Sequence, residues 1–191
     1  MGPVEREQVA QALRAGAGDL SVSLLEVRPG DIRRLLRNRS VDIVLARTIA
    51  ATEGIDSASR RPTTAVLWVP ITHPLAAAAS VRLAQLDGAR MLTWNLPGTP
   101  FTDLILDRLA AAGCTVETVQ ARVTGAAYAA ELSGLGAVAL MPAGWPPGEG
   151  VAGIPLEDDV ALPLLMLWRA GIPTPAAERV RAGMASSAPH P

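Results

Sequence analysis

The chain has 191 residues, of which 49% are hydrophobic and 18% charged, and this composition excludes an intrinsically disordered protein. A chain of this length buries roughly 70% of the surface that it exposes when unfolded, which is enough for one domain or two small lobes. Its formal net charge is −1, so the overall charge gives no electrostatic signature of nucleic-acid binding.

The cysteine content and the lengths of the apolar runs indicate the cellular compartment of the protein. Cys114 is the only cysteine, which excludes an internal disulfide and favours a reducing compartment. The first residues lack the apolar core of a signal peptide, and no apolar run approaches the roughly 20 residues of a membrane span. We therefore expect a cytoplasmic protein that has no membrane partner.

The first quarter of the chain is predicted to alternate helices with strands. Residues 3–15 have the amphipathic pattern of a helix, and residues 20–27 are typical of a strand. The turn over residues 28–31 leads to a short helix over 32–36, and residues 41–46 form a second strand.

Four arginines occupy the polar face of the short helix and the residues just after it: Arg33, Arg34, Arg37 and Arg39. They form either a basic patch or a solvated helix face. The solvated face is the interpretation that we favour from sequence, because charge runs on helices usually face water.

Residues 64–76 are the stretch around which the rest of the chain is organised. Residues 65–69 are a continuous β-prone apolar run, the pattern of a strand covered on both faces. Pro70 removes a ladder donor, so the strand ends or changes partners there, and residues 72–74 are typical of an extended turn. Such a strand suits a crossing between two lobes, and residues 48–63 before it are predicted to be a polar connection.

The clearest helix begins at Thr99 as N-cap, with Pro100 at the first helical position. The other expected elements are a helical piece over 80–86, strands over 90–94, 115–121 and 137–141, a helix over 125–133, a surface loop over 143–153, a buried run over 162–168 that makes the return crossing, a last helix over 174–184 and a disordered tail over 185–191. This alternation predicts an α/β fold with a mostly parallel sheet in each of two lobes. The lobes are predicted to be residues 1–69 with 166–191, and residues 70–165.

Motifs for cofactor binding or catalysis are weak. Gly134, Gly136 and Ala139 fit the spacing of a dinucleotide fingerprint, but a helix precedes them and a strand follows, which is the reverse of the required context. His73 is the only histidine in the folded region, and a structural turn is favoured over a general base. Cys114 is interpreted as buried and inert. We therefore expect no cofactor, no metal site, no catalytic residues and no enzyme activity.

Several segments, taken in order, resemble the effector-binding domain of LysR-type transcriptional regulators. The matching segments are 41–45, 67–76 ending in His-Pro-Leu-Ala, 83–86, 135–142, 163–169 and 174–177. Their order and spacing over residues 24–184 carry the resemblance. It implies a type 2 periplasmic-binding-protein-like fold, with two lobes of mixed, mostly parallel sheet, flanking helices and two crossover strands. It also implies a small-molecule effector held between the lobes.

The resemblance further implies an assembly and a relation to DNA. Domains of this family pair antiparallel, which predicts a homodimer through the helices over 4–15 and 101–112. The winged helix-turn-helix of the family is absent from this chain, so we expect DNA binding only through a domain that the chain does not contain. The sequence begins almost at the family's first helix, so the first strand is either cut off or the first lobe is degenerate.

Ten residues are candidates, by their position in this fold, to line the effector site. They are Arg28, Pro29, Thr48, Thr72, Trp94, Thr99, Phe101, Thr102, Thr124 and Gly125. Helix N-termini and free backbone N–H groups at several of these places favour a carboxylate effector, and Arg28 would supplement them. For any single residue of this set, ordinary helix capping or local packing is the simpler interpretation.

The leading functional hypothesis is a ligand-sensing module of a LysR-type regulator. One alternative is a free-standing small-molecule-binding protein or enzyme on the same fold, because a fold does not determine a function. Another is a truncated paralogue that dimerises with full-length regulators and inactivates them.

Overall fold

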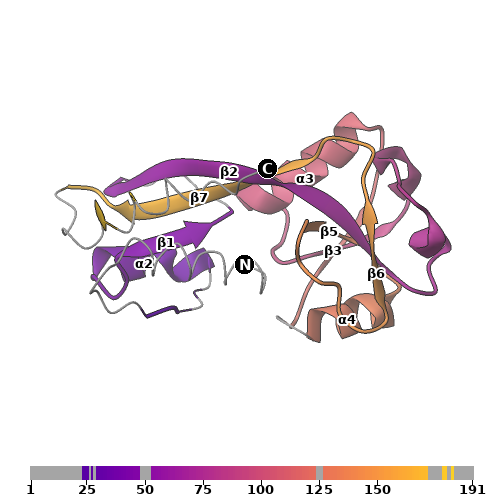
Figure 1. Ribbon diagram of the computed structural model, residues 1–191, viewed down its shortest axis with the longest axis horizontal. Coiled ribbons are helices and arrows are strands. Elements are labelled where there is room, and N and C mark those ends of the chain that lie inside the picture. The colour runs from indigo at the N-terminus through magenta and orange to yellow at the C-terminus, as the bar shows by residue number, and fades with distance from the viewer. Residues whose placement is uncertain are drawn as a thin grey trace. The chain divides into compact units, whose positions relative to one another are not determined.

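The computed structural model describes residues 23–25, 27, 29–47, 53–123, 127–171, 178–179 and 182 (Figure 1). The predicted helix over residues 3–15 and the predicted tail over 185–191 lie outside the described residues. The strand predicted over 20–27 and the helix predicted over 174–184 are described only in part, and the described residues of the former belong to no strand.

The chain divides into two compact units. Unit 1 contains Met1–Pro62 and Pro163–Pro191, and unit 2 contains Thr63–Leu162. Both passages between the units fall inside long strands, β2 (Ile55–Pro70) and β7 (Ala161–Arg169). The two crossing strands predicted at residues 65–69 and 162–168 lie within these elements.

Unit 1 is organised around a short helix and an antiparallel strand pair. Its described elements, besides its parts of β2 and β7, are η1 (Pro29–Asp31), α2 (Ile32–Arg37) and β1 (Ile43–Ala46). β1 pairs antiparallel with β7, from Ile43 opposite Trp168 to Ala46 opposite Leu165. Leu36 of α2 is buried with Val44 and Leu167, so α2 turns its apolar side to this pair and its polar side outward.

Unit 2 contains a parallel strand pair and an antiparallel set around β2. β3 (Arg90–Thr93) pairs parallel with β4 (Glu117–Gln120). β5 (Ala139–Pro142) and β6 (Val151–Pro155) each pair antiparallel with β2. A parallel bridge from Met91 to Val138 connects β3 to the start of β5.

The core of unit 2 lies on both faces of β2 because successive side chains of a strand point to opposite faces. Leu67 faces a cluster that includes Ile105 and Leu109 of helix α3 (Pro100–Ala111). Trp68 faces a second cluster that includes Tyr128 and Leu132 of helix α4 (Ala127–Leu135). The two helices therefore cover opposite faces, and the short 3-10 helices η2 (Pro74–Ala77) and η3 (Leu83–Leu86) complete the unit.

The α/β class predicted from the sequence is confirmed, with three differences of detail. The polar connection predicted over 48–63 was wrong from residue 55 onward, because β2 already begins at Ile55. Most of the side chains described over residues 55–64 are exposed, so backbone pairing and not an apolar pattern makes this half of the strand. The loop predicted over 143–153 ends earlier, because β6 begins at Val151. Pairing of β1 with β7 and of β2 with β5 and β6 is antiparallel, so the sheets are less parallel than expected.

No helix among the described residues is both long and apolar enough to cross a membrane.

Candidate functional site

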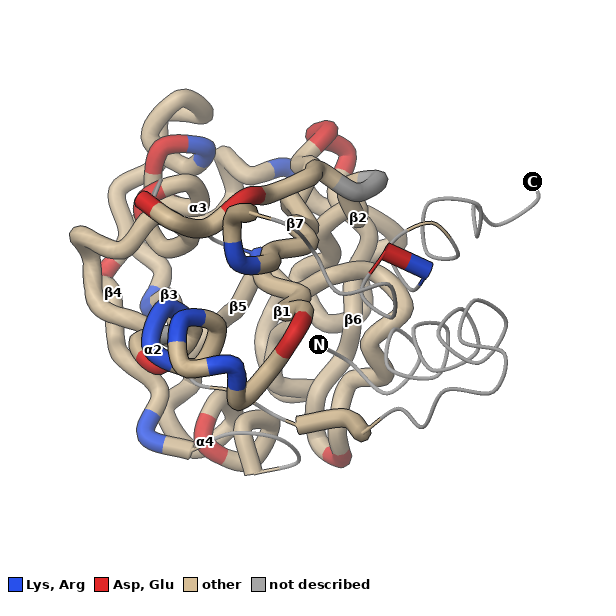
Figure 2. Tube along the Cα trace, turned by 90° about the vertical axis from the view of Figure 1, so that its left-hand side faces the viewer, with Lys and Arg blue, Asp and Glu red and all other residues tan. Residues whose placement is uncertain are grey.

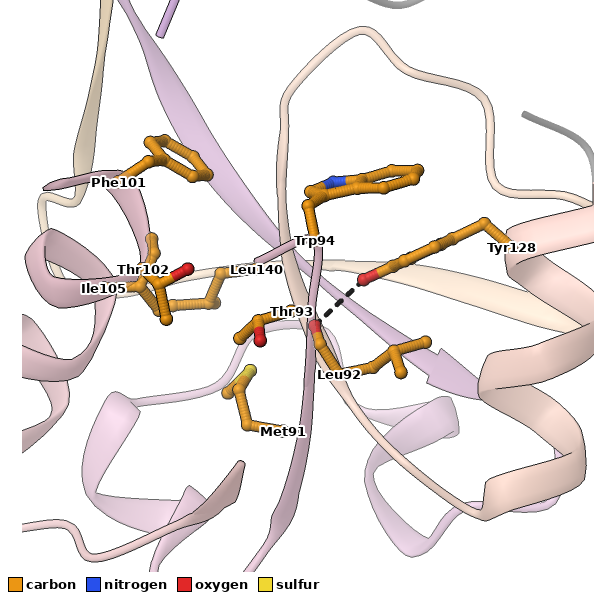
Figure 3. Close-up of a pocket in the computed structure, with 9 residues that line it drawn as sticks. All are labelled: Met91, Leu92, Thr93, Trp94, Phe101, Thr102, Ile105, Tyr128 and Leu140. Carbon is orange, nitrogen blue, oxygen red and sulfur yellow. Dashed lines mark hydrogen bonds between the residues drawn. The ribbon is translucent and has the colours of Figure 1, made fainter. Parts of the chain in front are cut away.

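A small pocket lies in unit 2 at the carboxyl end of β3 (Figure 3). Its lining residues are Met91, Leu92, Thr93, Trp94, Phe101, Thr102, Ile105, Tyr128 and Leu140. They come from β3 and the residue just after it, from the first two turns of α3, from α4 and from β5. The carboxyl ends of strands in α/β folds are where ligands commonly bind, so the chain topology itself places this pocket at a usable position.

Two aromatic rings form one wall of the pocket. The ring of Trp94 stacks on the ring of Tyr128, with centroids 4.2 Å apart and planes at 19°. The Tyr128 hydroxyl donates to the carbonyl of Leu92 at 2.9 Å. Burial raises the pKa of Tyr128 well above its usual range, and the nearby charge of Glu131 raises it further. The phenol therefore remains a protonated donor, and its hydrogen bond fixes the ring on which Trp94 rests.

Two threonines of the pocket are committed to the backbone. The hydroxyls of Thr93 and Thr102 donate to the carbonyl of Asn95, at 2.8 and 3.0 Å. Both threonines are buried. These bonds tie the turn after β3 to the first turn of α3, so they position the pocket walls and leave neither hydroxyl proton for a ligand.

The N-terminus of α3 is not capped by a side chain. Thr99 is the N-cap residue and Pro100 follows at the first helical position, as predicted. The expected side-chain cap was wrong, because the Thr99 hydroxyl donates backward to the carbonyl of Leu96 at 2.9 Å. Among the described residues, none accepts from the backbone N–H groups of Phe101 and Thr102. These two donors carry the partial positive charge of a helix N-terminus.

The carboxylate of Glu131 accepts from two backbone N–H groups in the segment that follows β4. The Arg122 N–H donates to both oxygens of Glu131, at 3.0 Å each, and the Val123 N–H donates to Oε2 at 3.3 Å. Glu131 lies on α4 one turn after Tyr128. The segment that follows β4 thus already holds an anion, which the chain supplies itself.

The pocket is almost filled by its own side chains. Its open volume is about 10 Å³, roughly what one water molecule needs. In Figure 3 the rings of Phe101 and Trp94 lie at one end, and Met91 and Leu92 lie at the other. The two rings are half-buried, whereas Met91 and Leu92 are fully buried. A molecule larger than water therefore meets the ring end of the pocket first.

The structure brings together some of the sequence-predicted site residues. Trp94, Phe101 and Thr102 line the pocket, and Thr99 precedes them at the start of α3. Thr72 is exposed in the turn after β2 and is not among the lining residues.

The remaining candidates belong elsewhere or cannot be placed. Pro29 lies in η1 of unit 1. Arg28, Thr48, Thr124 and Gly125 lie outside the described residues. Whether any of the ten touches an effector stays a prediction.

Sequence reasoning missed three residues of this region. Tyr128, Asn95 and Glu131 were not candidates, although they hold the ring wall, the turn after β3 and the backbone after β4. Tyr128 is the only tyrosine of the chain, and a single large ring in a helix of small residues was the signal available. Asn95 acts through its carbonyl, which no sequence pattern reveals.

The other titratable candidates have structural partners. His73 Nδ1 accepts the N–H of Leu75 at 3.2 Å, and partial burial lowers the pKa of His73. Cys114 is buried and its thiol donates to the carbonyl of Leu83 at 2.9 Å. Burial raises the pKa of Cys114, and the charge of Asp87 raises it further. Both arrangements agree with the structural roles predicted for His73 and Cys114. No cluster of three metal-binding side chains is found in the part of the chain that the structure describes.

Comparison with solved structures shows that other proteins have a fold similar to that of this chain. Three solved structures illustrate the similarity. The effector-binding domain of BenM with its effector benzoate is 16% identical, with a TM-score of 0.74, over 94% of this chain and 83% of that one. CbnR, a LysR family transcriptional regulator, is 18% identical, with a TM-score of 0.82, over 100% of this chain and 68% of that one. The effector-binding domain of QuiR in complex with shikimate is 15% identical, with a TM-score of 0.78, over 96% of this chain and 90% of that one.

Identities this low show the fold alone, which is the periplasmic-binding-protein-like class expected from the sequence. No curated relative matches the chain. The family model of the LysR substrate binding domain, however, matches residues 7–188, which is nearly the entire sequence. The chain therefore belongs to the family of LysR substrate-binding domains.

Proposed function

We propose that the chain is the ligand-sensing regulatory domain of a LysR-type transcription regulator, and that it binds a small carboxylate at the ring end of the pocket in unit 2. Membership of the family supports the sensing role. Two of the similar structures carry benzoate and shikimate, and both molecules combine one ring with one carboxylate. This is the chemical class that we extend to the present chain.

The observation that carries the proposal is the uncapped N-terminus of α3 beside two half-buried rings. The N–H groups of Phe101 and Thr102 are two adjacent donors that no described residue uses. Such a pair binds a carboxylate well because hydrogen bonding and the helix dipole act together. The ring of Phe101 belongs to the same turn, and the ring of Trp94 lies at the same end of the pocket. A flat ring would contact these two rings while its carboxylate meets the donors.

The pocket interior is too small to hold such a molecule, so the effector is expected to lie on its rim. The open volume of about 10 Å³ would have to grow many-fold to take a six-membered ring. Tyr128 opposes this growth because its ring is buried and hydrogen-bonded. Binding at the rim requires only that the half-buried rings adjust.

A thermal-shift titration tests the proposal. Benzoate and shikimate are added to the 191-residue chain, with methyl benzoate as the uncharged control. A carboxylate present at 100 times its Kd should add about 2.7 kcal/mol to the free energy of unfolding, which raises Tm by roughly 5–11 °C for a chain of this size. If a panel of small ring carboxylates gives no rise above that of methyl benzoate, carboxylate sensing by this chain is refuted.

Two substitutions at Thr99 locate the binding site. In Thr99→Asp a carboxylate of the chain itself can accept from the free donors, so this variant should gain about 0.5–1 kcal/mol of stability and lose the ligand-induced shift. Thr99→Ala supplies no acceptor and should keep the shift. Because stability and binding change in opposite directions in Thr99→Asp, misfolding cannot mimic the expected result. A full ligand shift in Thr99→Asp would place the carboxylate elsewhere.

We also propose that the chain forms a homodimer and that α3 contributes to the contact. The partner helix predicted over residues 4–15 lies outside the described residues. On α3, Ile105 and Leu109 are buried in unit 2, whereas Leu104 is only half-buried and is not packed in its core clusters. Leu104→Arg should lower the molar mass measured by light scattering to that of a monomer. Ala110→Arg, at an exposed position of the same helix, is the control, and equal masses for both variants would exclude Leu104 from the interface.

A further inference from the structure

Three arginines and two small residues surround an open hollow on unit 1, which we call the arginine hollow. It is lined by Gly30, Arg33, Arg34, Arg37 and Asn38. All five are exposed. Figure 2 shows the basic residues of α2 as neighbouring blue segments on the side that faces the viewer. Three arginines thus lie next to one another on this short helix, whereas other exposed arginines, such as Arg82, Arg108 and Arg122, lie in unit 2.

The opposite side of α2 holds the helix in place. Leu36 is buried with Val44 and Leu167, and Ile32 packs against the same cluster. Residues 33, 34 and 37 are consequently directed away from the strand pair, because positions 32 and 36 define the buried stripe of the helix. Positions 33 and 37 are one turn apart and share a face.

The segment that contains α2 carries more positive than negative charge in the sequence. Residues 29–42 contain four arginines and two aspartates, a net charge of +2, so the rest of the chain carries −3 to give the total of −1. Asp31 pairs with Arg34 at 2.8 Å, and both side chains remain largely exposed. The total charge thus conceals a segment of the sequence that is net positive.

One side-chain hydrogen bond and one backbone conformation favour a functional use of this surface. The Arg37 guanidinium donates to the carbonyl of Glu53 at 3.0 Å, which restricts its orientation. Arg39, just after α2, has a φ of 63°, a conformation that glycine adopts with less strain. The chain thus has an arginine at a position where the backbone favours glycine, and this extends the cationic run by one side chain.

We propose that the arginine hollow binds the phosphate groups of duplex DNA. The inference rests on the proposed function, because a transcription regulator is held beside DNA. It adds to that function a direct contact by the regulatory domain, and so replaces the expectation that this chain itself does not touch DNA. Guanidinium groups bind phosphate oxygens in a planar, two-pronged geometry. Several arginines that lie close together on one short helix suit the successive phosphates of a DNA strand better than they suit a single isolated anion. Such contacts carry no base specificity.

Salt-dependent binding of a mixed-sequence duplex tests the inference. A fluorescently labelled 20-base-pair duplex is titrated with the 191-residue chain by anisotropy, in 50–200 mM KCl and without effector. Three phosphate contacts give a slope of about −2.7 for log K against log salt, which is a loss of roughly 40-fold in affinity over this range. The triple variant Arg33→Gln/Arg34→Gln/Arg37→Gln should bring the slope close to zero.

Two further variants separate the hollow from general charge and from misfolding. Arg82→Gln/Arg108→Gln/Arg122→Gln removes the same charge from exposed positions of unit 2 and should keep the slope within about one unit of the original. Arg33→Lys/Arg34→Lys/Arg37→Lys keeps the charge and should keep most of the slope. An equal loss in the unit 2 variant, or no loss in the glutamine variant of the hollow, overturns the proposal.

Competitors and effector binding complete the test. A polyglutamate peptide that binds as tightly as the duplex, or inorganic pyrophosphate that binds where the duplex does not, also overturns the assignment to DNA. The same variants are examined for the benzoate-induced shift in Tm. This shift depends on α3 and not on α2, so failure of DNA binding and failure of effector sensing are distinguished.

Discussion

Replacing Glu131 by alanine should destabilise unit 2 far more than the loss of an exposed carboxylate normally does. The Glu131 oxygens accept two backbone N–H groups, those of Arg122 at 3.0 Å and of Val123 at 3.3 Å. These bonds hold the segment after β4 against α4. Without the carboxylate, the two donors must find water or remain unpaired.

The size of the effect follows from the charge on the acceptor. Hydrogen bonds to a charged group contribute about 1.5–3 kcal/mol, and partial exposure of Glu131 reduces this, because water can replace the carboxylate. We expect Glu131→Ala to lose roughly 2 kcal/mol, which lowers Tm by roughly 4–8 °C in a chain of this size. Glu131→Gln keeps an acceptor oxygen and should lose about half as much.

Urea unfolding and amide hydrogen exchange provide the measurement, with Glu117→Ala as the matched control. Glu117 also carries one negative charge and forms an exposed ion pair with Arg90 at 3.2 Å, so its loss should cost at most about 1 kcal/mol. Exchange of the Val123 amide should accelerate in Glu131→Ala and not in Glu117→Ala. Equal Tm values for the two variants, with unchanged exchange at Val123, would refute the reasoning.

Three other predictions follow from local geometry. Gly153→Ala should raise the free energy of unfolding measured in urea by about 0.4–1 kcal/mol, because the added Cβ would meet its neighbours at 3.7–3.8 Å, an ordinary van der Waals contact. Gly136→Ala should lower the free energy of unfolding by about 1 kcal/mol, because the φ of Gly136 is +58°. Burial lowers the pKa of His73 in the folded chain, so the folded state favours the neutral imidazole. The stability that His73 contributes is therefore present above about pH 6.5, the ordinary pKa of histidine. It is lost as the pH falls below that value and through the lowered pKa of the folded state. His73→Asn, which keeps an acceptor for the Leu75 N–H, should therefore lose less stability than the parent chain between pH 7.5 and 5.5. Leu132→Ala should cost about 2–5 kcal/mol by calorimetry, because Leu132 is 0% exposed, and a loss below 1 kcal/mol would contradict the packing described.

Elements with a strong apolar pattern could be predicted from the sequence, and elements made by backbone pairing could not. The run over residues 65–69 and the stripe of α3 were both visible because burial fixes which residues are apolar. The first half of β2 was missed because its side chains are polar and exposed. β6 was missed because Gly153 and Pro155 are residues typical of loops.

Part of the pocket lining could be predicted from the sequence, but its chemistry could not. Phe101 and Thr102 were candidates because Pro100 and a later glycine mark a helix that starts at Thr99. Which groups are free there depends on the direction in which each hydroxyl donates, and Thr99 donates backward while Thr102 donates to Asn95. A sequence fixes the presence of a hydroxyl and not its partner, so the uncapped donors emerged only from the structure.

The two anion sites proposed here should respond differently to salt, because the charge that attracts the anion differs. At α3 the attraction comes from short hydrogen bonds to the N–H groups of Phe101 and Thr102, which act at contact distance. At the arginine hollow it comes from exposed guanidinium groups and from the release of counterions around DNA. The Debye length is about 10 Å at 0.1 M salt and 3 Å at 1 M salt. At the lower salt concentration it is therefore much longer than a hydrogen bond, so salt screens contacts at hydrogen-bond distance only weakly. Raising KCl from 50 to 200 mM should therefore weaken duplex binding by more than tenfold and carboxylate binding by only a small factor. A common salt dependence would show that a single electrostatic field, and not two separate surfaces, attracts both anions.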